Sequence, residues 1–143
     1  MKKVVVGVDG SEASRAGVKW CALNLTRTTR VIAVTGMSET GEFVMSLPGP
    51  DAAASTDQVR ETFRQKWCAP LDAAGLEWEA RFVHHSQPTA IAQVVDDEQP
   101  DLVVIGKPEH VALDLMVHGK LQHALHHAQC PVLIVPSAGA GAP

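Results

Sequence analysis

Residues 3–21 read KVVVGVDGSEASRAGVKWC, and this stretch decides the fold class. It opens with a continuous β-branched run over 3–9, which is too short for a buried helix and is typical of a parallel strand covered on both faces. Ser11 follows as the N-cap of a helix predicted at 12–25. The negative charge of Glu12, in the first turn, interacts favourably with the dipole of this helix. The apolar face expected for this helix consists of Ala13, Ala16, Trp20 and Cys21.

The alternation of strand-like runs and helical patterns continues along the chain. Short apolar runs predict buried parallel strands at 30–34, 101–106 and 131–136. Residues 76–82 alternate apolar and charged side chains, which is typical of a half-exposed strand at a sheet edge. The helical patterns between the strands have apolar faces formed by Val59, Phe63, Trp67 and Leu71, by Ile91, Val94 and Val95, and by Leu121, Ala124, Leu125 and Ala128. The order predicts an α/β protein with a doubly wound sheet of five parallel strands and helices on both faces.

Proline and glycine set the expected helix boundaries. The second helix is expected to begin near Thr56 or Asp57. Pro70 removes one backbone hydrogen bond and should kink or end this helix, and Gly75 should stop it. Pro88 suits the first turn of the third helix, where a missing N–H costs nothing.

The chain of 143 residues has room for one domain, which we expect over residues 1–136. Residues 137–143 are expected to form a disordered tail. Two long connections, at 35–55 and 106–119, follow predicted strands and lie with Asp9 at the carboxyl ends of the sheet. Open α/β sheets bind ligands at this end, so the candidate site is expected there.

The composition excludes several classes of protein. Apolar residues make up 45% and charged residues 20% of the chain, as in an ordinary globular domain. A formal charge of -4 argues against a nucleic-acid partner, which needs a basic face. No apolar run approaches the roughly 20 residues of a membrane helix, and the first one is too short for a signal peptide. The three cysteines, Cys21, Cys68 and Cys130, have no CxxC spacing and are expected to be reduced, buried thiols of a cytoplasmic protein.

Three segments are similar to the universal stress protein family, in the order and at the spacing of that family. They are VVVGVDGSEASRAGVKWC at 4–21, QPTAIAQVV with PDLVVIG at 87–106, and HALHHAQCPVLIVP at 123–136. The resemblance covers residues 2–136 and implies the strand order 3-2-1-4-5. It also implies a homodimer formed through the last strand, by Val132, Leu133, Ile134 and Val135.

The residues of the last strand lead to the same expectation about assembly. This strand is apolar on both faces, and an exposed apolar edge promotes aggregation unless it is paired. Pairing with a second copy across a twofold axis would cover it. A loop or helix of the same chain that covers the edge is the alternative.

Many members of this family bind ATP through the motif G-x-x-G, nine residues, then G-[S/T]. Gly106 and Gly119 match the first and third glycines at the same spacing. Glu109 replaces the second glycine, and Lys120 replaces the Ser or Thr. In the motif, the glycines let backbone N–H groups approach the phosphates. Half of the pattern is kept in this chain and half is lost.

Glu109 decides the expected affinity for ATP. A carboxylate about 4 Å from a phosphate costs on the order of 4 kcal/mol at an effective dielectric of about 20. This cost corresponds to roughly a thousandfold loss of affinity. Lys107 and Lys120 could offset part of it, and Glu109 could instead hold Mg²⁺ or turn outward. We expect that tight ATP binding in the usual mode is lost.

The resemblance places a ribose contact at Asp9 and an adenine contact near Val34. Each residue also has a purely structural interpretation, Asp9 as a turn or cap acceptor and Val34 as part of the core. No cofactor is therefore expected, and ATP with Mg²⁺ is the alternative.

The seven histidines and the possible nucleophiles do not define an active site. His123, His126 and His127 have helical metal-ligand spacing but point away from the apolar face, so no metal site is expected. The pairs His84 with His85 and His110 with His118 could line the rim near Asp9, or be ordinary surface residues. No catalytic motif is present, and no catalytic residue is expected.

The sequence thus supports two main hypotheses about function. The first is a cytoplasmic regulatory homodimer with a degenerate nucleotide site that acts through an unknown protein partner or another ligand. The second is a nucleotide-binding protein of the same fold with at most slow ATP hydrolysis. An enzyme that uses the histidine-rich rim is a weaker third hypothesis.

Overall fold

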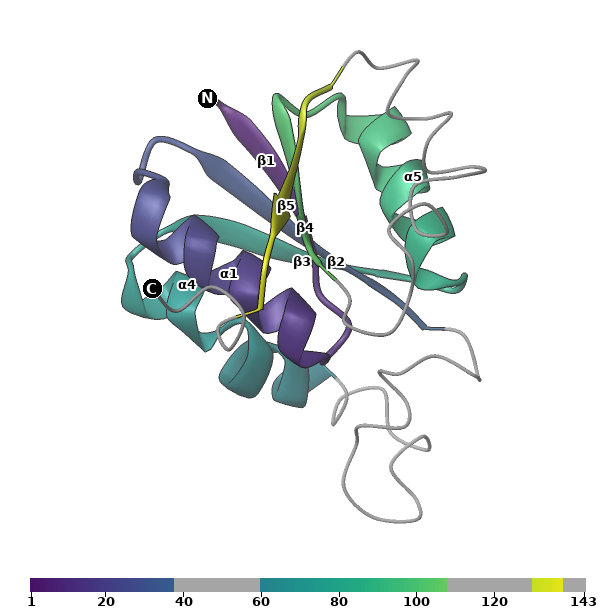
Figure 1. The fold of residues 1–143 in the computed structure, drawn as a ribbon, viewed down its shortest axis with the longest axis horizontal. Coiled ribbons are helices and arrows are strands. Elements are labelled where there is room, and N and C mark those ends of the chain that lie inside the picture. The colour runs from purple at the N-terminus through teal and green to yellow at the C-terminus, as the bar shows by residue number, and fades with distance from the viewer. Residues whose placement is uncertain (38–59, 108–129, 138–143) are drawn as a thin grey trace.

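A computed structural model describes residues 1–37, 60–107 and 130–137 of the chain. Within it lies a parallel sheet of five strands in the order β3-β2-β1-β4-β5 (Figure 1). The strands are β1 (Lys3–Gly7), β2 (Arg30–Gly36), β3 (Glu77–Val83), β4 (Leu102–Gly106) and β5 (Val132–Val135). In the register, Val5 of β1 lies between Ile32 of β2 and Val103 of β4. The predicted fold class and strand order are confirmed.

Helices cover both faces of this sheet (Figure 1). One face carries α1 (Glu12–Asn24), a π-helical segment η2 (Phe63–Trp67) and α4 (Ala69–Ala73). The other carries α5 (Gln87–Glu98), with Pro88 in its first turn as predicted. No helix in the described part of the chain is long and apolar enough to span a membrane.

The N-terminus of α1 forms as predicted, and its buried face matches the prediction in part, since Ala16 and Cys21 are buried. Ser14 N donates to the Oγ of the N-cap Ser11 over 3.2 Å. The buried side chains include Ser14, Val18 and Cys21, whereas the predicted Trp20 is only half-buried. Burial of Ser14 is possible because its hydroxyl donates to Ser11 O and accepts from Asp9 N. The apolar pattern did not reveal this polar contact.

The second helical region is interrupted near Pro70, as the sequence predicts. The π-helical segment η2 ends at Cys68, whose N–H donates to Phe63 O over 2.9 Å. The short helix α4 then starts with Pro70 in its first turn. Gly75 follows with a φ of +72°, in the left-handed region where glycine is favoured, and ends the helix.

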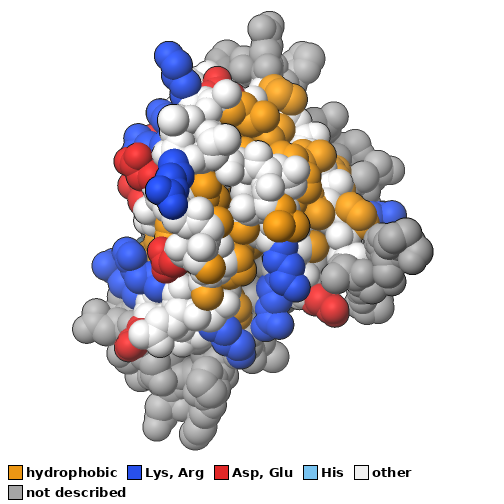
Figure 2. All heavy atoms as spheres, turned by 90° about the vertical axis from the view of Figure 1, so that its left-hand side faces the viewer, with side chains coloured by type: hydrophobic (Ala, Val, Ile, Leu, Met, Phe, Trp, Pro, Cys, Tyr) orange, Lys and Arg blue, Asp and Glu red, His pale blue; other side chains and the backbone are white. Residues whose placement is uncertain are grey.

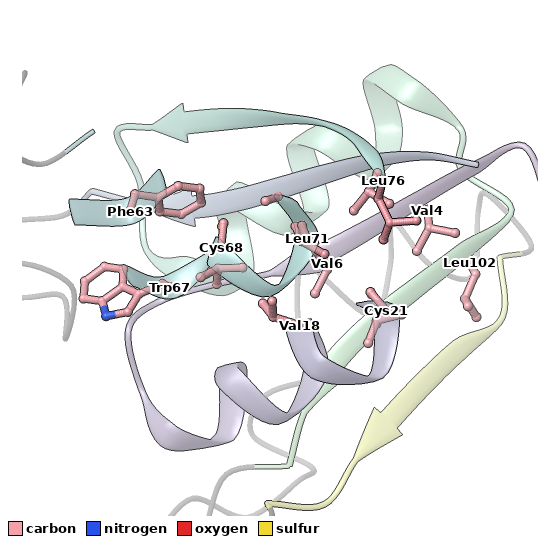
Figure 3. Packing of buried hydrophobic residues seen from close by; sticks show 14 residues of the cluster. Val4, Val6, Val18, Cys21, Phe63, Trp67, Cys68, Leu71, Leu76 and Leu102 are labelled. Atoms are coloured by element: carbon pink, nitrogen blue, oxygen red, sulfur yellow. The ribbon is translucent and has the colours of Figure 1, made fainter. Parts of the chain in front are cut away.

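Two hydrophobic clusters hold the helices on the sheet. The larger lies under α1, η2 and α4, and Figure 3 shows its side chains converging between these helices and the strands. Phe63, Leu71 and Val18 are completely buried in it. The second cluster joins α5 to the sheet through Ala90, Ile91, Val94 and Val95. The predicted inward faces of the second and third helical regions are confirmed for the described residues.

The edge strand β3 has one apolar and one charged face. Trp78, Ala80 and Phe82 pack against the larger cluster. On the other face, Arg81 forms ion pairs with Glu79 and with Glu98 of α5, the latter at 3.2 Å. Partial burial raises the pKa of Glu98, but hydrogen bonds and charges from Arg81 and Lys3 outweigh it and hold this pKa below its ordinary value. The predicted half-exposed edge strand is confirmed.

The described surface also carries apolar side chains. Figure 2 shows hydrophobic side chains gathered on the side of the molecule that lies at the left of Figure 1, with Lys and Arg side chains beside them. The large hydrophobic side chains that are exposed among the described residues are Met1 and Leu23. Single exposed side chains such as these two are normal for a globular protein.

Several predictions fall on residues that the structure does not describe. These are the start of the second helix with Val59, the helix with Leu121, Ala124, Leu125 and Ala128, and nearly all of the loop at 35–55. Of the predicted tail, Ser137 is described and is buried, whereas 138–143 lie outside the described residues.

Candidate functional site

The loop after β1 brings Asp9 to the carboxyl end of the sheet. Asp9 Oδ1 accepts a hydrogen bond from Ser11 N over 2.9 Å, and Asp9 N donates to Ser14 Oγ over 3.3 Å. These contacts are those of a turn that leads into a capped helix. Asp9 is half-buried, so its side chain is still partly accessible beside the loop.

Gly10 lets this loop lie directly on Trp67 of η2. Its φ is +85°, and a Cβ at this position would come within 2.6 Å of the Trp67 indole. Only glycine fits both the left-handed backbone and the short distance. The sequence showed the Asp-Gly turn, but it contained no signal that Trp67 supports it.

Val34 lies in the next strand, β2, and its side chain is completely buried. Its carbonyl oxygen accepts one hydrogen bond from Val8 N over 2.8 Å and a second from Gln87 Nε2 over 3.1 Å. The side chain is therefore a core residue, and the backbone is the part that faces the site. Both lone pairs of this carbonyl are in use.

Gln87 is a residue of this site that sequence reasoning missed. Its Oε1 accepts from Gly36 N over 2.6 Å, so the carboxamide bridges Val34 O and Gly36 N at the end of β2. His84 and His85 lie in the same turn between β3 and α5, and both are exposed. The only nearby sequence signal was Pro88, which predicts the start of the helix but not the hydrogen bonds of Gln87 to the end of β2.

Gly106, at the end of β4, lies against the first turn of α1. A Cβ at Gly106 would overlap the Ala13 carbonyl and come within 2.8 Å of Ser14 N. Ser14 also bonds to Asp9, so Asp9 and Gly106 are joined through one residue. Lys107 follows with an exposed side chain, and its N–H donates to Val135 O over 2.7 Å. The structure thus brings together Asp9, Val34 and Gly106, whereas Glu109, Gly119 and Lys120 lie outside the described residues.

Metal ligands and nucleophiles do not gather at this site in the described ranges. There, no group of three or more His, Cys, Asp or Glu side chains is placed to hold a metal ion. The three cysteines are free and buried. Burial raises the pKa of Cys21 to about 12, and it also raises the pKa of Cys68 and Cys130. Thiols of this kind are unreactive.

The fold is that of an α/β protein whose strand order reverses between β1 and β4, the place where open α/β sheets bind ligands. Residues 1–136 match the sequence model of the universal stress protein family. The chain therefore belongs to the universal stress protein family.

Solved structures have the same fold at low sequence identity. A universal stress protein family protein from Arabidopsis thaliana, with AMP bound, is 16% identical with a TM-score of 0.69, over 100% of this chain and 96% of that chain. A universal stress protein in complex with cAMP is 24% identical with a TM-score of 0.60, over 96% and 98%. A family member from Burkholderia pseudomallei is 21% identical with a TM-score of 0.59, over 94% and 96%.

Proposed function

We propose that this protein is a stress-response binding module with a degenerate nucleotide site, acting as a cytoplasmic homodimer on a protein partner or a ligand other than ATP. The observation that carries this proposal is that Asp9 and Gly106 already have complete structural roles. Asp9 Oδ1 closes the turn before α1, and Gly106 makes room for the first turn of α1. The presence of Asp9 and Gly106 at these positions is therefore explained without a nucleotide. The proposal also rests on Glu109 and Lys120, which stand where the family motif has a glycine and a Ser or Thr that hold the phosphates.

Thermal unfolding with ATP and Mg²⁺ tests the loss of the phosphate site. We expect no change in the Tm of the wild-type protein. The double variant Glu109→Gly with Lys120→Ser should gain ATP binding, because the carboxylate is removed and the glycine and hydroxyl are restored. At 100 times its Kd, ATP should stabilise the variant by about 2.7 kcal/mol. For a domain of this size the Tm should rise by roughly 8 °C.

A charge-matched variant controls for nonspecific attraction of ATP. Lys19→Ser with Asp97→Asn removes one positive and one negative charge from exposed positions on α1 and α5. It should behave like the wild-type protein. A micromolar Kd of the wild-type protein for ATP by calorimetry would show that the site is not degenerate.

A nucleotide-binding function is the second candidate, and the similar structures with AMP and with cAMP favour it. AMP places a single phosphate in the site, so it depends less on residues 106–120 than ATP does. Calorimetry with AMP alongside ATP therefore separates the two candidates. Binding of AMP but not of ATP would indicate an AMP-responsive module, and hydrolysis is then not part of the function.

The homodimer is proposed to form through β5. This strand is at the sheet edge, and all four of its side chains are half-buried. Val103 N donates to Pro131 O and Lys107 N donates to Val135 O, so residues 131 and 135 face β4. By alternation, the backbone groups of Val132 and Ile134 face away from β4, toward the edge at which the second copy is proposed to pair.

Ile134→Pro should abolish the dimer, because proline removes the outward N–H without breaking the ladder to β4. Ile134→Ala is the matched control, since it also truncates the side chain but keeps the N–H. We expect sedimentation at micromolar concentration to show a dimer for the wild-type and Ile134→Ala proteins and a monomer for Ile134→Pro. A monomeric wild-type protein would refute the proposed assembly.

A further inference from the structure

The carboxamide of Gln87 lies at the carboxyl end of β2, whose last residue, Gly36, is buried. Its Nε2 donates to Val34 O over 3.1 Å, and its Oε1 accepts from Gly36 N over 2.6 Å. One side chain thus satisfies an acceptor and a donor that lie two residues apart on the strand. The contact is between segments separated by more than fifty residues, so it depends on the tertiary fold.

The position of this carboxamide places it over the strand ends that form the candidate site. Gln87 Nε2 would lie 3.4 Å from a Cβ added at Gly7, the last residue of β1. Asp9 follows two residues later. A Cβ at Gly36 would come within 2.7 Å of Gln87 N, so the end of β2 also lies directly against the start of α5. Gln87 therefore reaches the end of β2 and remains half-buried at the site.

The chemistry of the two backbone groups indicates what else could bind them. A carbonyl acceptor beside an N–H donor pairs with any planar group that offers an adjacent N–H and lone pair. A carboxamide offers this pair, and so does adenine, through its amino group and a neighbouring ring nitrogen. Gln87 and an adenine base would compete for the same two partners.

We propose that Gln87 is an intramolecular competitor that holds the base-binding position at the end of β2 closed. This inference rests on the proposed function, which concerns the phosphate end of the same site. An adenine-type base must displace the carboxamide before it can pair with Val34 O and Gly36 N. Because two hydrogen bonds are exchanged, the apparent affinity of the wild-type protein is lowered about tenfold or more.

Calorimetry with adenosine tests this proposal without involving Glu109, because adenosine carries no phosphate. Gln87→Ala should bind adenosine at least about tenfold more tightly than the wild-type protein, since Gly36 N and one lone pair of Val34 O become free while Val34 O keeps its bond to Val8 N. Gln87→Glu should show no gain, because its carboxylate still accepts from Gly36 N. N6,N6-dimethyladenosine, which lacks the amino donor, should not bind Gln87→Ala more tightly than it binds the wild-type protein. Equal adenosine affinity of Gln87→Ala and the wild-type protein, including no measurable binding to either, would overturn the proposal.

A measurement on the wild-type protein covers the case in which Gln87→Ala does not fold. In ¹⁵N-labelled protein, adenosine at saturating concentration should shift the Gln87 side-chain amide and the Gly36 backbone amide together. Saturation that leaves both resonances unmoved would overturn the proposal. A purely structural tie of α5 to β2 predicts lower stability of Gln87→Ala but no gain in affinity.

The ATP and adenosine experiments distinguish the two failures. Micromolar ATP binding by the wild-type protein refutes the degenerate phosphate site, and the adenosine comparison still tests Gln87. Absence of ATP binding, together with no gain in Gln87→Ala, refutes the role of Gln87 and leaves the proposed function standing.

Discussion

Phe63→Ala should lower the free energy of unfolding by about 3–5 kcal/mol. The Phe63 ring is completely buried between η2 and β3. Its centroid lies 5.1 Å from that of Phe82, 6.4 Å from that of Trp78 and 6.5 Å from that of Trp67. Truncation leaves a cavity among rigid rings that cannot collapse around it, and it also removes the edge-to-face contacts. Equilibrium unfolding in urea, followed by tryptophan fluorescence, measures the loss.

Leu23→Ala is the control for this prediction. Leu23 is on α1 with a relative exposure of 84%, so its truncation should change the free energy of unfolding by less than about 0.5 kcal/mol. Natural domains are stable by only about 5–15 kcal/mol, so Phe63→Ala should remove a large share of the total stability while Leu23→Ala leaves it nearly unchanged. A loss below about 1 kcal/mol for Phe63→Ala would mean that η2 does not pack on β3 as described.

The sheet could be predicted from the sequence because its strands have distinct patterns. Strands buried on both faces, such as β1 and β4, are short β-branched runs, and the edge strand β3 alternates apolar and charged side chains. The period of the pattern therefore identified β3 as one edge strand, but not β5, an apolar run that lies at the other edge. The assignment of strand order came from the family resemblance, and the structure has the same order.

The finer features were not predictable because they depend on contacts between distant segments. Ser14 is buried because the backbone of the preceding turn satisfies its hydroxyl, and residue polarity alone suggested the opposite. The π-helical segment η2 has the same apolar residues as an α-helix would, so periodicity does not distinguish the two forms. Gln87 is one glutamine among several polar residues, and only the packing of α5 against β2 gives it a role.

The candidate site was predicted in part. Asp9, Val34 and Gly106 do lie at the carboxyl end of the sheet, as the strand pattern and the family resemblance indicate. Two of them, Asp9 and Gly106, have structural contacts that would be needed whether or not a nucleotide binds. A residue that has a structural role as well as a possible nucleotide contact does not show whether the site is functional or degenerate. The replaced positions Glu109 and Lys120 therefore carry more information than the retained ones.

Gly106→Ala should destabilise the protein by on the order of 4 kcal/mol, because α1 and β4 touch through backbone atoms at this position. The added Cβ would overlap the Ala13 carbonyl and lie 2.8 Å from Ser14 N. Neither group can rotate away, since both belong to the first turn of α1. The turn would have to move as a whole and would lose the contact of Ser14 with Asp9. Thermal and urea unfolding measure the effect.

Gly17→Ala provides the opposite result at the same interface. A Cβ at Gly17 would lie 3.5 Å from Val104 Cγ1 and 3.6 Å from Gly106 N, which are ordinary contact distances. Alanine is the better helix former, so this variant should gain about 0.5–1 kcal/mol. Near-equal stability of the two variants would mean that α1 lies further from β4 than described. If they differ as expected, packing alone explains why Gly106 is a glycine, and its match to the nucleotide motif says nothing about nucleotide binding.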